Sequence, residues 1–322
     1  MRIVFAGTPQ PAVPSLLALV DAGHEVPLVI TRPDAPIGRR RVLTPSPVAA
    51  AGLELGLAVH RTARLDEEAL TAVREAQPDL GVIVAYGGLV REPLLSTPRH
   101  GWINLPFSVL PRWRGAAPVQ HAIIAGDPEV GADVFQLTHG LDEGDIFGEI
   151  RFPRPADATA GDLLATLAES GAELLAAVVG EIADGTARPR PQQGEPTYAP
   201  KLSIEDGRVD WEQPREQVVS RIFGVTPEPG AFATADGSRL KILAAGPASA
   251  DSPRLRPGLA ASHAKQVIVG TATHPIALQR VQPAGKPAMD AGDWWRGTRL
   301  SELQFDTGNA GEPSPGASGA TA

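Results

Sequence analysis

The chain has 322 residues, of which 43% are hydrophobic and 20% charged, and its formal net charge is −8. Such values are typical of a soluble globular protein with room for two domains, and the acidic balance argues against nonspecific coating of nucleic acid. The absence of cysteine excludes disulfides, thiolate zinc ligands and thiol nucleophiles. We predict no signal peptide, and we expect no membrane span because no window approaches the necessary length of apolar residues.

The N-terminal part alternates strand and helix patterns. Residues 2–6 form an apolar run that ends at Gly7, residues 11–22 carry apolar side chains at helical spacing, and residues 26–31 form a second apolar run. Strand, glycine turn, helix and strand predict a βαβ unit with a parallel sheet. Because the turn lacks the G-x-G-x-x-G pattern, we predict no bound dinucleotide.

A basic segment follows the second strand. Residues 32–48 contain four prolines, which argue against regular structure across most of the segment. Arg39, Arg40 and Arg41 lie together beside Gly38. Two interpretations stay open from these residues alone: a solvated surface loop with a chance cluster of charge, or a mobile loop that binds phosphates.

The rest of the chain divides into a first domain at 1–188, a linker at 189–205, a second domain at 206–305 and a disordered tail at 306–322. In the first domain we predict helices at 47–55, 66–76, 116–125 and 160–183, and strands at 80–86, 102–104, 132–137 and 146–152. In the second domain we predict strands at 209–211, 230–234, 240–245, 266–270 and 276–281, with one helix at 215–223. Short strands with Gly/Pro turns indicate a small barrel.

Two segments carry unusual chemistry for their length. Residues 101–120 combine two Trp, two Arg, three Pro and one Asn, and residues 140–145 read GLDEGD. We interpret the first segment as a substrate pocket and the second as a loop that faces it. No residues have the spacing of metal ligands, so we predict no metal.

These segments, with several others in the same order, resemble the methionyl-tRNA formyltransferases over nearly the whole chain. The matching pieces are FAGTP at 5–9, the basic segment at 32–48, VAYGGL at 84–89, SVLPRWRGAAPVQ at 108–120, GLDEGDI at 140–146, YAPKLS and RVDW between 198 and 211, TPEPGAF at 226–232 and QPAGK at 282–286. The resemblance implies an α/β fold: a Rossmann-like, parallel-sheet formyltransferase domain followed by an OB-like β-barrel. It also implies a cytoplasmic protein of translation initiation, which we predict to be a monomer.

The implied reaction moves the formyl group of 10-formyltetrahydrofolate to the amino group of methionine on initiator tRNA. Such acyl transfer needs an oxyanion donor, a proton carrier and a group that orients the carrier. The resemblance assigns the donor to Asn104 and the facing carboxylate to Asp142, and it expects a histidine where this chain has Pro106. Because proline has no ionisable group, we expect impaired transfer while folate and tRNA binding persist. His121 and His139 are candidates to replace the carrier, although we predict that both are ordinary surface histidines.

The resemblance also assigns binding residues. For folate they are Tyr86, Gly87, Ser108, Val109, Leu110, Pro111 and Arg114; for tRNA they are Arg39, Arg40, Arg41, Lys241 and Lys286. Arg114 could instead be a structural salt-bridge partner, and Pro287 stands where the family commonly has a second lysine. Two other functions remain open: a catalytically dead homologue that binds folate or tRNA, and a formyltransferase that acts on a nucleotide sugar or another small amine.

Overall fold

The computed structural model describes residues 1–38 and 41–307. Arg39, Arg40 and the predicted disordered tail from residue 308 onward lie outside the described residues. The chain divides into two compact units, which are described separately below. The first contains Met1–Val119, Pro128–Arg154 and Asp162–Pro200; the second contains Gln120–Asp127, Pro155–Gly161 and the chain from Lys201.

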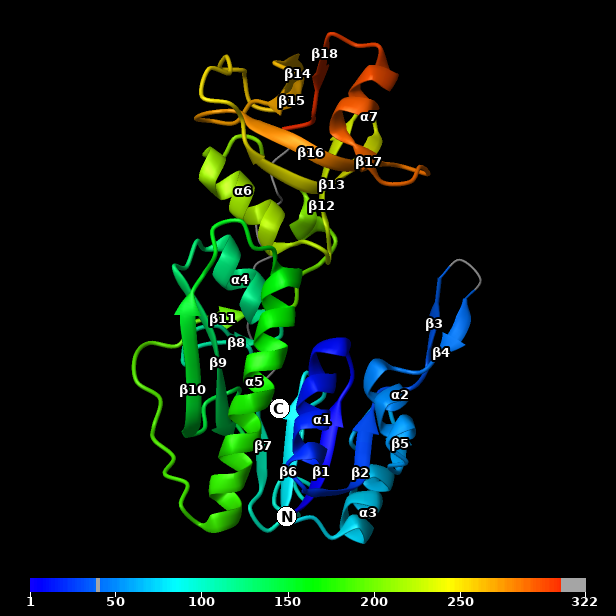
Figure 1. Cartoon of the computed structure of the whole chain (residues 1–322), viewed down its shortest axis with the longest axis vertical. Helices are drawn as coiled ribbons and strands as arrows, with labels where there is room; N and C mark the ends of the chain where they lie inside the picture. Colours follow the sequence, from blue (N-terminus) through cyan, green and yellow to red (C-terminus); the bar gives the residue numbers. More distant parts are fainter. Residues whose placement is uncertain (39–40, 308–322) are drawn as a thin grey trace, which may run out of the picture. The chain divides into compact units, whose positions relative to one another are not determined.

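A seven-stranded sheet forms the centre of the first unit (Figure 1). Its order is β10-β9-β7-β6-β1-β2-β5, with β1 at Arg2–Gly7, β2 at Glu25–Thr31, β5 at Val59–Arg61, β6 at Leu80–Val84, β7 at Trp102–Asn104, β9 at Glu129–Gln136 and β10 at Ile146–Pro153. The five strands from β7 to β5 are parallel, which confirms the predicted parallel sheet. Strand β9 departs from the prediction, because it runs antiparallel to both β7 and β10.

Helices cover this sheet, and α1 and α5 lie across its front in Figure 1. These helices are α1 at Val13–Asp21, α2 at Pro47–Glu54, α3 at Glu67–Ala76 and α5 at Ala160–Asp184. Helix α4 at Pro118–Ile124 begins in this unit and continues into the second. The predicted N-cap of α3 is confirmed, because the Asp66 carboxylate accepts a hydrogen bond from the Ala69 N–H at 3.4 Å. Leu70 and Val73 of α3 pack into a core with Val4 and Ala6 of β1.

The expectation that no segment is apolar enough to span a membrane is wrong for α5. This helix has 25 residues and passes that test by length and composition alone. Its apolar side chains have another use, however: Leu167 and Leu175 are fully buried, and Gly171 lies against Leu105 and Phe107. The apolar character of α5 therefore matches that of a helix packed on a sheet.

The basic segment is more regular than its prolines suggested. Strand β3 at Ala35–Ile37 pairs with β4 at Val42–Thr44 in an antiparallel hairpin, with Pro36 opposite Leu43. Proline is tolerated here because each strand of a two-stranded ribbon has a free edge toward which a residue without an N–H can face. Gly38 and Arg41 have φ values of +72° and +50°, and the Arg41 N–H donates to the Gly38 carbonyl at 3.1 Å.

An antiparallel sheet forms the second unit. Its order is β12-β13-β16-β15-β14-β18, with β12 at Ala231–Ala235, β13 at Ser238–Pro247, β14 at Leu259–His263, β15 at Gln266–Val269, β16 at Ile276–Pro283 and β18 at Glu302–Gln304; β17 at Met289–Asp290 pairs with β16. Asp306, just beyond β18, donates its N–H to the carbonyl of Thr234 in β12 at 2.8 Å. This bond joins the two edge strands, as the predicted barrel requires.

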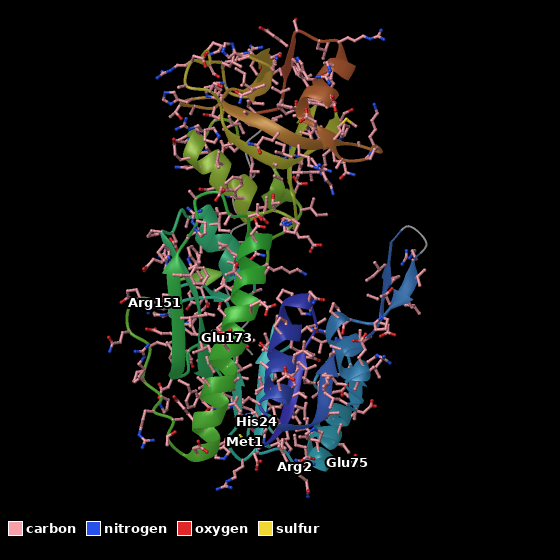
Figure 2. All side chains as sticks on the ribbon, viewed as in Figure 1. Met1, Arg2, His24, Glu75, Arg151 and Glu173 are labelled. Atoms are coloured by element: carbon pink, nitrogen blue, oxygen red, sulfur yellow. The ribbon has the colours of Figure 1, made fainter. Side chains whose placement is uncertain are left out.

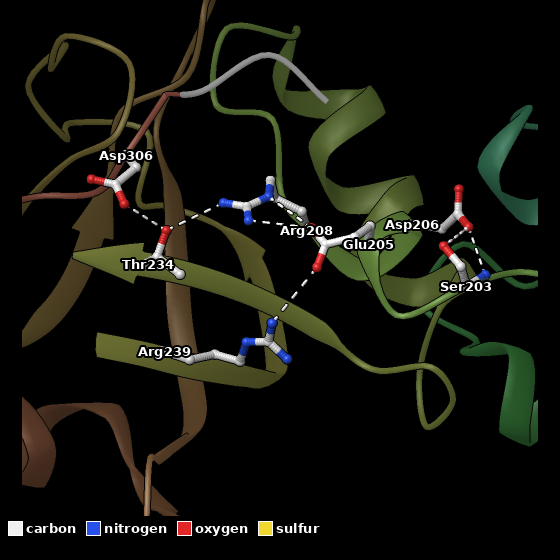
Figure 3. Close-up of polar contacts among 7 residues, drawn as sticks. All are labelled: Ser203, Glu205, Asp206, Arg208, Thr234, Arg239 and Asp306. Carbon is white, nitrogen blue, oxygen red and sulfur yellow. Dashed lines mark hydrogen bonds and ion pairs between the residues drawn. The ribbon is translucent and has the colours of Figure 1, made fainter. Parts of the chain in front are cut away.

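Polar contacts reinforce this junction (Figure 3). The Thr234 hydroxyl lies 2.6 Å from the Asp306 carboxylate and 3.3 Å from the Arg208 guanidinium, which also bonds to Glu205. Arg239 lies 3.8 Å from the other carboxylate oxygen of Glu205. The network connects residues that precede the sheet with both of its edges.

Some predictions for the second unit are wrong. Residues 209–211 are not a strand; only Arg208 forms an isolated bridge, with Phe232, and Trp211 stacks on Phe305 in the core at 5.6 Å. The predicted helix at 215–223 is confirmed as α6 at Arg215–Gly224. Strands β14 and β18 and helix α7 at Ala291–Thr298 were not predicted. Asp290 caps the N-terminus of α7, because its carboxylate accepts the Gly292 N–H at 2.7 Å.

Candidate active site

The strand order places the candidate site at the carboxyl ends of β1, β6 and β7. The chain builds β1, β2 and β5 toward one edge of the sheet and then returns to build β6 and β7 on the other side of β1. In open α/β sheets, ligands bind outside the carboxyl ends of the strands where this order reverses. The motifs after Gly7, Val84 and Asn104 all begin at these strand ends.

Asn104 is the last residue of β7. Its backbone pairs with Ile83 on one side and with Phe135 on the other, so both flanking strands fix its position. Its side chain is half-buried and has no hydrogen-bond partner within residues 1–38 and 41–307. The carboxamide N–H is therefore available to an external acceptor, as an oxyanion donor must be.

The carboxylate Asp133 lies on β9 beside Pro106 and was not predicted. Its N–H donates to the Pro106 carbonyl at 3.3 Å. Because Asn104 and Phe135 are directly opposed, and Asp133 lies two residues from Phe135, the three side chains share one face of the sheet. The available signal was a charged residue in the middle of a strand, with Ala132 and Val134 on either side of it, because a charged side chain is rarely buried unless it is paired.

Burial controls the ionisation of Asp133. The side chain is fully buried, and burial raises its pKa to about 7. The N–H of Leu110 donates to Oδ2 at 2.7 Å and lowers the pKa, Glu149 raises it, and Arg151 and Arg190 lower it. The carboxyl group is therefore held near the midpoint of its titration at neutral pH.

The predicted folate turn, Ser108–Pro111, packs against β9. Leu110 contacts Phe135 and Ile146 in a small apolar cluster, and the Arg112 N–H donates to the Val109 carbonyl at 3.1 Å. Ser108 is buried, and its hydroxyl has no partner in the described part of the chain. The turn thus combines an apolar wall with an unused polar atom, a composition typical of small-molecule sites.

The loop at 140–145 is fixed through Asp142. This residue has a φ of +50°, and its Oδ2 accepts the Gly115 N–H at 2.8 Å. Burial raises the pKa of the Asp142 carboxyl, while the Gly115 N–H and the charge of Arg114 lower it. The structure therefore brings Asp142 to the segment that contains Arg114. No hydrogen bond joins Asp142 to Asn104 among residues 1–38 and 41–307.

Gln192 holds this loop, although its role was not predicted. Its Nε2 donates to the carbonyls of Asp142 and Gly144 at 2.7 and 2.9 Å, and its Oε1 accepts from the Arg114 guanidinium at 2.7 Å. The predicted linker is therefore held to the first unit as far as β11 at Tyr198–Ala199, which pairs with β8 at Arg114–Gly115. The interpretation of Arg114 as a salt-bridge partner is unnecessary, since an amide oxygen holds it.

We expect Gln192→Ala to loosen the loop at 140–145. The change removes three hydrogen bonds, and one such bond contributes about 1 kcal/mol, so local opening should become at least about tenfold more frequent. Hydrogen exchange of the loop amides, read by mass spectrometry, measures this. The adjacent and exposed Gln193 gives the control Gln193→Ala; equal exchange in the two variants would contradict the role of Gln192.

The remaining predicted folate residues have mixed positions. Tyr86 is 2% exposed and its hydroxyl donates to the Thr62 carbonyl at 3.3 Å, so its ring belongs to the core. Gly87 has a φ of +74°, and its carbonyl accepts from Arg32. The Tyr86 carbonyl accepts from the Thr8 hydroxyl at 3.4 Å, so both carbonyls are occupied and the Tyr86 side chain is not available to a ligand.

Neither candidate histidine is seen beside Asn104. His139 is exposed, and its Nε2 lies 4.0 Å from the Glu92 carboxylate, which confirms a surface histidine. His121 lies on α4 in the second unit, where its charge helps to lower the pKa of Asp206. Neither of these two histidines is thus seen to replace the side chain that is missing at position 106.

An open cavity of about 560 Å³ borders the loop at 140–145. It is lined by Arg114, Gln136, Thr138, Glu143, Gly144, Asp145, Phe147 and Pro189. Asn104 is not among its lining residues. We therefore locate the candidate site by the strand ends and the free Asn104 amide rather than by this cavity.

The predicted tRNA-binding cations that the structure describes are exposed. Lys241 on β13 pairs with Gln282, whose side-chain amide donates to the carbonyl of Lys286 at 3.0 Å. The two lysines therefore lie near each other in the second unit. Arg41 is exposed in the turn of the β3–β4 hairpin. Among the described residues, no group of three or more His, Cys, Asp or Glu could hold a metal.

Comparison with known families agrees with this fold and site. The formyl transferase family model matches residues 1–179, and the model of the formyl transferase C-terminal domain matches residues 201–299. The fold is thus that of a formyl transferase. The chain is 60% identical over 297 residues to the methionyl-tRNA formyltransferase of Leifsonia xyli subsp. xyli (strain CTCB07), covering 92% of this chain and 97% of the relative. It belongs to the methionyl-tRNA formyltransferase family.

Other relatives and solved structures are consistent with this family. The methionyl-tRNA formyltransferase of Clavibacter sepedonicus is 56% identical over 94% of this chain and 99% of its own. WlaRD, a sugar 3N-formyl transferase solved in the presence of dTDP and 5-N-formyl-THF, has a TM-score of 0.65 and 16% identity over 89% of this chain and 99% of its own. HypX from Aquifex aeolicus, in complex with tetrahydrofolic acid, has a TM-score of 0.62 and 20% identity over 91% of this chain and 46% of its own. These two structures support the fold alone.

Proposed function

We propose that this chain transfers the formyl group of 10-formyltetrahydrofolate to the amino group of methionine on charged initiator tRNA, as a monomer in the cytoplasm. The observation that carries the proposal is the free Asn104 carboxamide at the end of β7, in a chain 60% identical to a methionyl-tRNA formyltransferase. The folate ligands named for HypX and WlaRD support a folate donor.

The chemistry follows from the groups present. The amine nitrogen of methionine attacks the formyl carbon, and the carbonyl oxygen becomes an oxyanion that the Asn104 amide stabilises. Collapse of this intermediate breaks the bond to the folate nitrogen. The amine must lose one proton and the folate nitrogen must gain one. Of the residues that the resemblance assigns to catalysis, Asp142 is the ionisable one that this chain retains, and burial raises its pKa toward the pH range of proton exchange.

Pro106 is proposed to slow formyl transfer without preventing folate binding. The turn Ser108–Pro111 and the loop around Asp142 retain most of the family's motifs, with Val109 where leucine is usual, which supports folate binding. No side chain at position 106 can carry a proton between the amine and the folate nitrogen, and solvent must do so more slowly. The same observation keeps the second candidate function open, a homologue that binds folate and tRNA without transfer.

A formyl-transfer assay with a radiolabelled donor tests the proposed function. The acceptors are charged initiator tRNA and, as an alternative, a nucleotide-linked amino sugar. We expect label on the methionine of the tRNA and none on the sugar, with a slow rate. Label on the sugar alone would contradict the proposal, and folate binding without label on either acceptor would favour the inactive homologue.

The basic hairpin is proposed to bind tRNA phosphates through Arg39, Arg40 and Arg41. We expect replacement of all three by alanine to weaken tRNA binding and to reduce the slope of log K against log salt by about one for each lost phosphate contact. Titrations of tRNA at several salt concentrations measure this slope. Arg99→Ala, at an exposed arginine outside the hairpin, is the control; a slope that the hairpin variant shares with the unaltered chain would remove this role.

A further inference from the structure

The buried carboxyl group of Asp133 has no place in the chemistry described above. The side chain is fully buried on β9, and the main-chain N–H of the same residue donates to the Pro106 carbonyl at 3.3 Å. One of its oxygens holds the Leu110 N–H at 2.7 Å, and the other has no partner in the described structure. The Ser108 hydroxyl, two residues from Leu110, is also buried without a partner. Two unused oxygens therefore border the turn proposed to contact folate.

We propose that Asp133 is a positioning residue of the formyl-transfer site, which holds the turn Ser108–Pro111 against β9 in the conformation that binds the folate donor. This inference rests on the proposed function. Asp133 is 23 residues from Leu110 in sequence, so the bond joins the turn to a strand that the sheet itself makes rigid. Among residues 1–38 and 41–307, it is the one hydrogen bond between the Leu110 main chain and β9.

If Asp133 only had to accept the Leu110 N–H, a neutral side chain could do so with a smaller free-energy cost of burial. Burying a carboxylate is unfavourable unless it is paired and hydrogen-bonded, whereas a serine or asparagine could accept the same N–H. Three charged groups act on Asp133: Glu149 and Arg151 of β10, and Arg190 of the segment after α5, which forms a bridge with Ile146 of β10. Glu149 bonds to both arginines, at 2.9 and 2.7 Å (Arg151 is labelled in Figure 2). The two cations support an ionised Asp133.

This arrangement makes the hold on the turn depend on pH. An ionised carboxylate accepts a stronger hydrogen bond than a protonated one. Since the pKa of Asp133 is raised to about 7, the hydrogen bond from the Leu110 N–H to this carboxylate strengthens as pH rises through neutrality and weakens below it. We therefore expect the folate affinity of the full chain to fall roughly fivefold between pH 8 and pH 6.

The test is calorimetric binding of 5-formyltetrahydrofolate, a non-transferring isomer of the donor, to the full chain at pH 6, 7 and 8. Asp133→Asn keeps an oxygen that can accept the Leu110 N–H but cannot titrate, so we expect affinity within about threefold of the unaltered chain at pH 8 and no pH dependence. Asp133→Val removes the acceptor, and we expect binding to weaken about tenfold. Asp21→Asn, at an exposed carboxylate of the same unit, is the control and should retain the parent profile.

Hydrogen exchange at the Leu110 amide gives a second readout. We expect its exchange to be faster in Asp133→Val, and the Asn variant decides the question by its pH profile if the Val variant does not fold. An unchanged affinity in a folded Val variant, or a parent-like pH profile in the Asn variant, would overturn this inference alone. Absence of folate binding by the unaltered chain at every pH would overturn the proposed function and this inference with it.

Discussion

Pro106→His is expected to raise the rate of formyl transfer by about 10²–10⁴-fold, the usual contribution of a general acid–base group. The substitution returns an ionisable side chain two residues after Asn104, on the same face of the sheet as Asn104 and Asp133 if the chain stays extended. The main-chain bond from the Asp133 N–H to the carbonyl of residue 106 does not depend on the side chain. The geometry of the turn should therefore survive the change. Single-turnover formylation of charged initiator tRNA measures the rate.

Pro106→Ala is the matched control, because it removes the ring without adding a proton carrier. We expect little gain in rate from alanine and a large gain from histidine. Equal gains would mean that the ring obstructs the site rather than that a proton carrier is missing. If Pro106→His does not raise the rate of the unaltered chain, Pro106 is not what limits formyl transfer.

The stability of the first unit is expected to fall as pH rises from about 4 to about 7, because of Asp133. Its folded-state pKa, about 7, is raised above the ordinary value of 3.8, so the folded chain keeps a proton that the unfolded chain has lost. The corresponding stability is complete below the unfolded pKa and is lost as pH rises through the folded pKa. At about 1.4 kcal/mol per pH unit, the full loss is about 4 kcal/mol. Burial raises the pKa of Asp142 as well, which adds in the same direction.

Asp133→Asn should remove this component, because asparagine does not titrate. The slowest-exchanging amides of β7 and β9 report the opening free energy of the first unit by itself, which avoids assuming one transition for both units. We expect the unaltered chain to lose several kcal/mol more than the variant between pH 5 and pH 8. If the opening free energies of the two proteins changed in parallel with pH, the proposed titration of the buried Asp133 carboxyl group would be contradicted. Ionisation of Asp133 strengthens the proposed hydrogen bond to the folate turn and also lowers the stability of the first unit. A change of pH that favours folate binding therefore lowers stability at this residue.

Sequence patterns predicted the elements whose signals are local. Strand β6 is apolar throughout, α3 has a capping Asp66, and α5 repeats apolar residues at helical spacing, so each could be located from its own residues. The hairpin of β3 and β4 depends on pairing between strands, which the prolines obscured. Helix α7 has only eight residues, two of them glycine, and too short a pattern to be predicted.

The site divides in the same way. Asn104, Asp142 and the position of Pro106 follow from motifs that are continuous in sequence. Asp133 acquires its role only because the sheet places it beside Pro106, and Gln192 is 50 residues from Asp142, which it holds. Contacts at such separations depend on strand register and on the path of a segment that composition alone marked as a linker. The structure was needed to find both residues.

We propose that this chain binds folate but transfers the formyl group slowly, because Pro106 stands where a proton carrier is needed. The most direct measurement compares, on the same preparations of the unaltered chain and of Pro106→His, the affinity for 5-formyltetrahydrofolate and the single-turnover rate with charged initiator tRNA. We predict affinities that agree within about twofold and a rate at least about a hundredfold higher in the histidine variant. Equal rates in the two proteins, or an affinity that appears only with histidine, would contradict the claim.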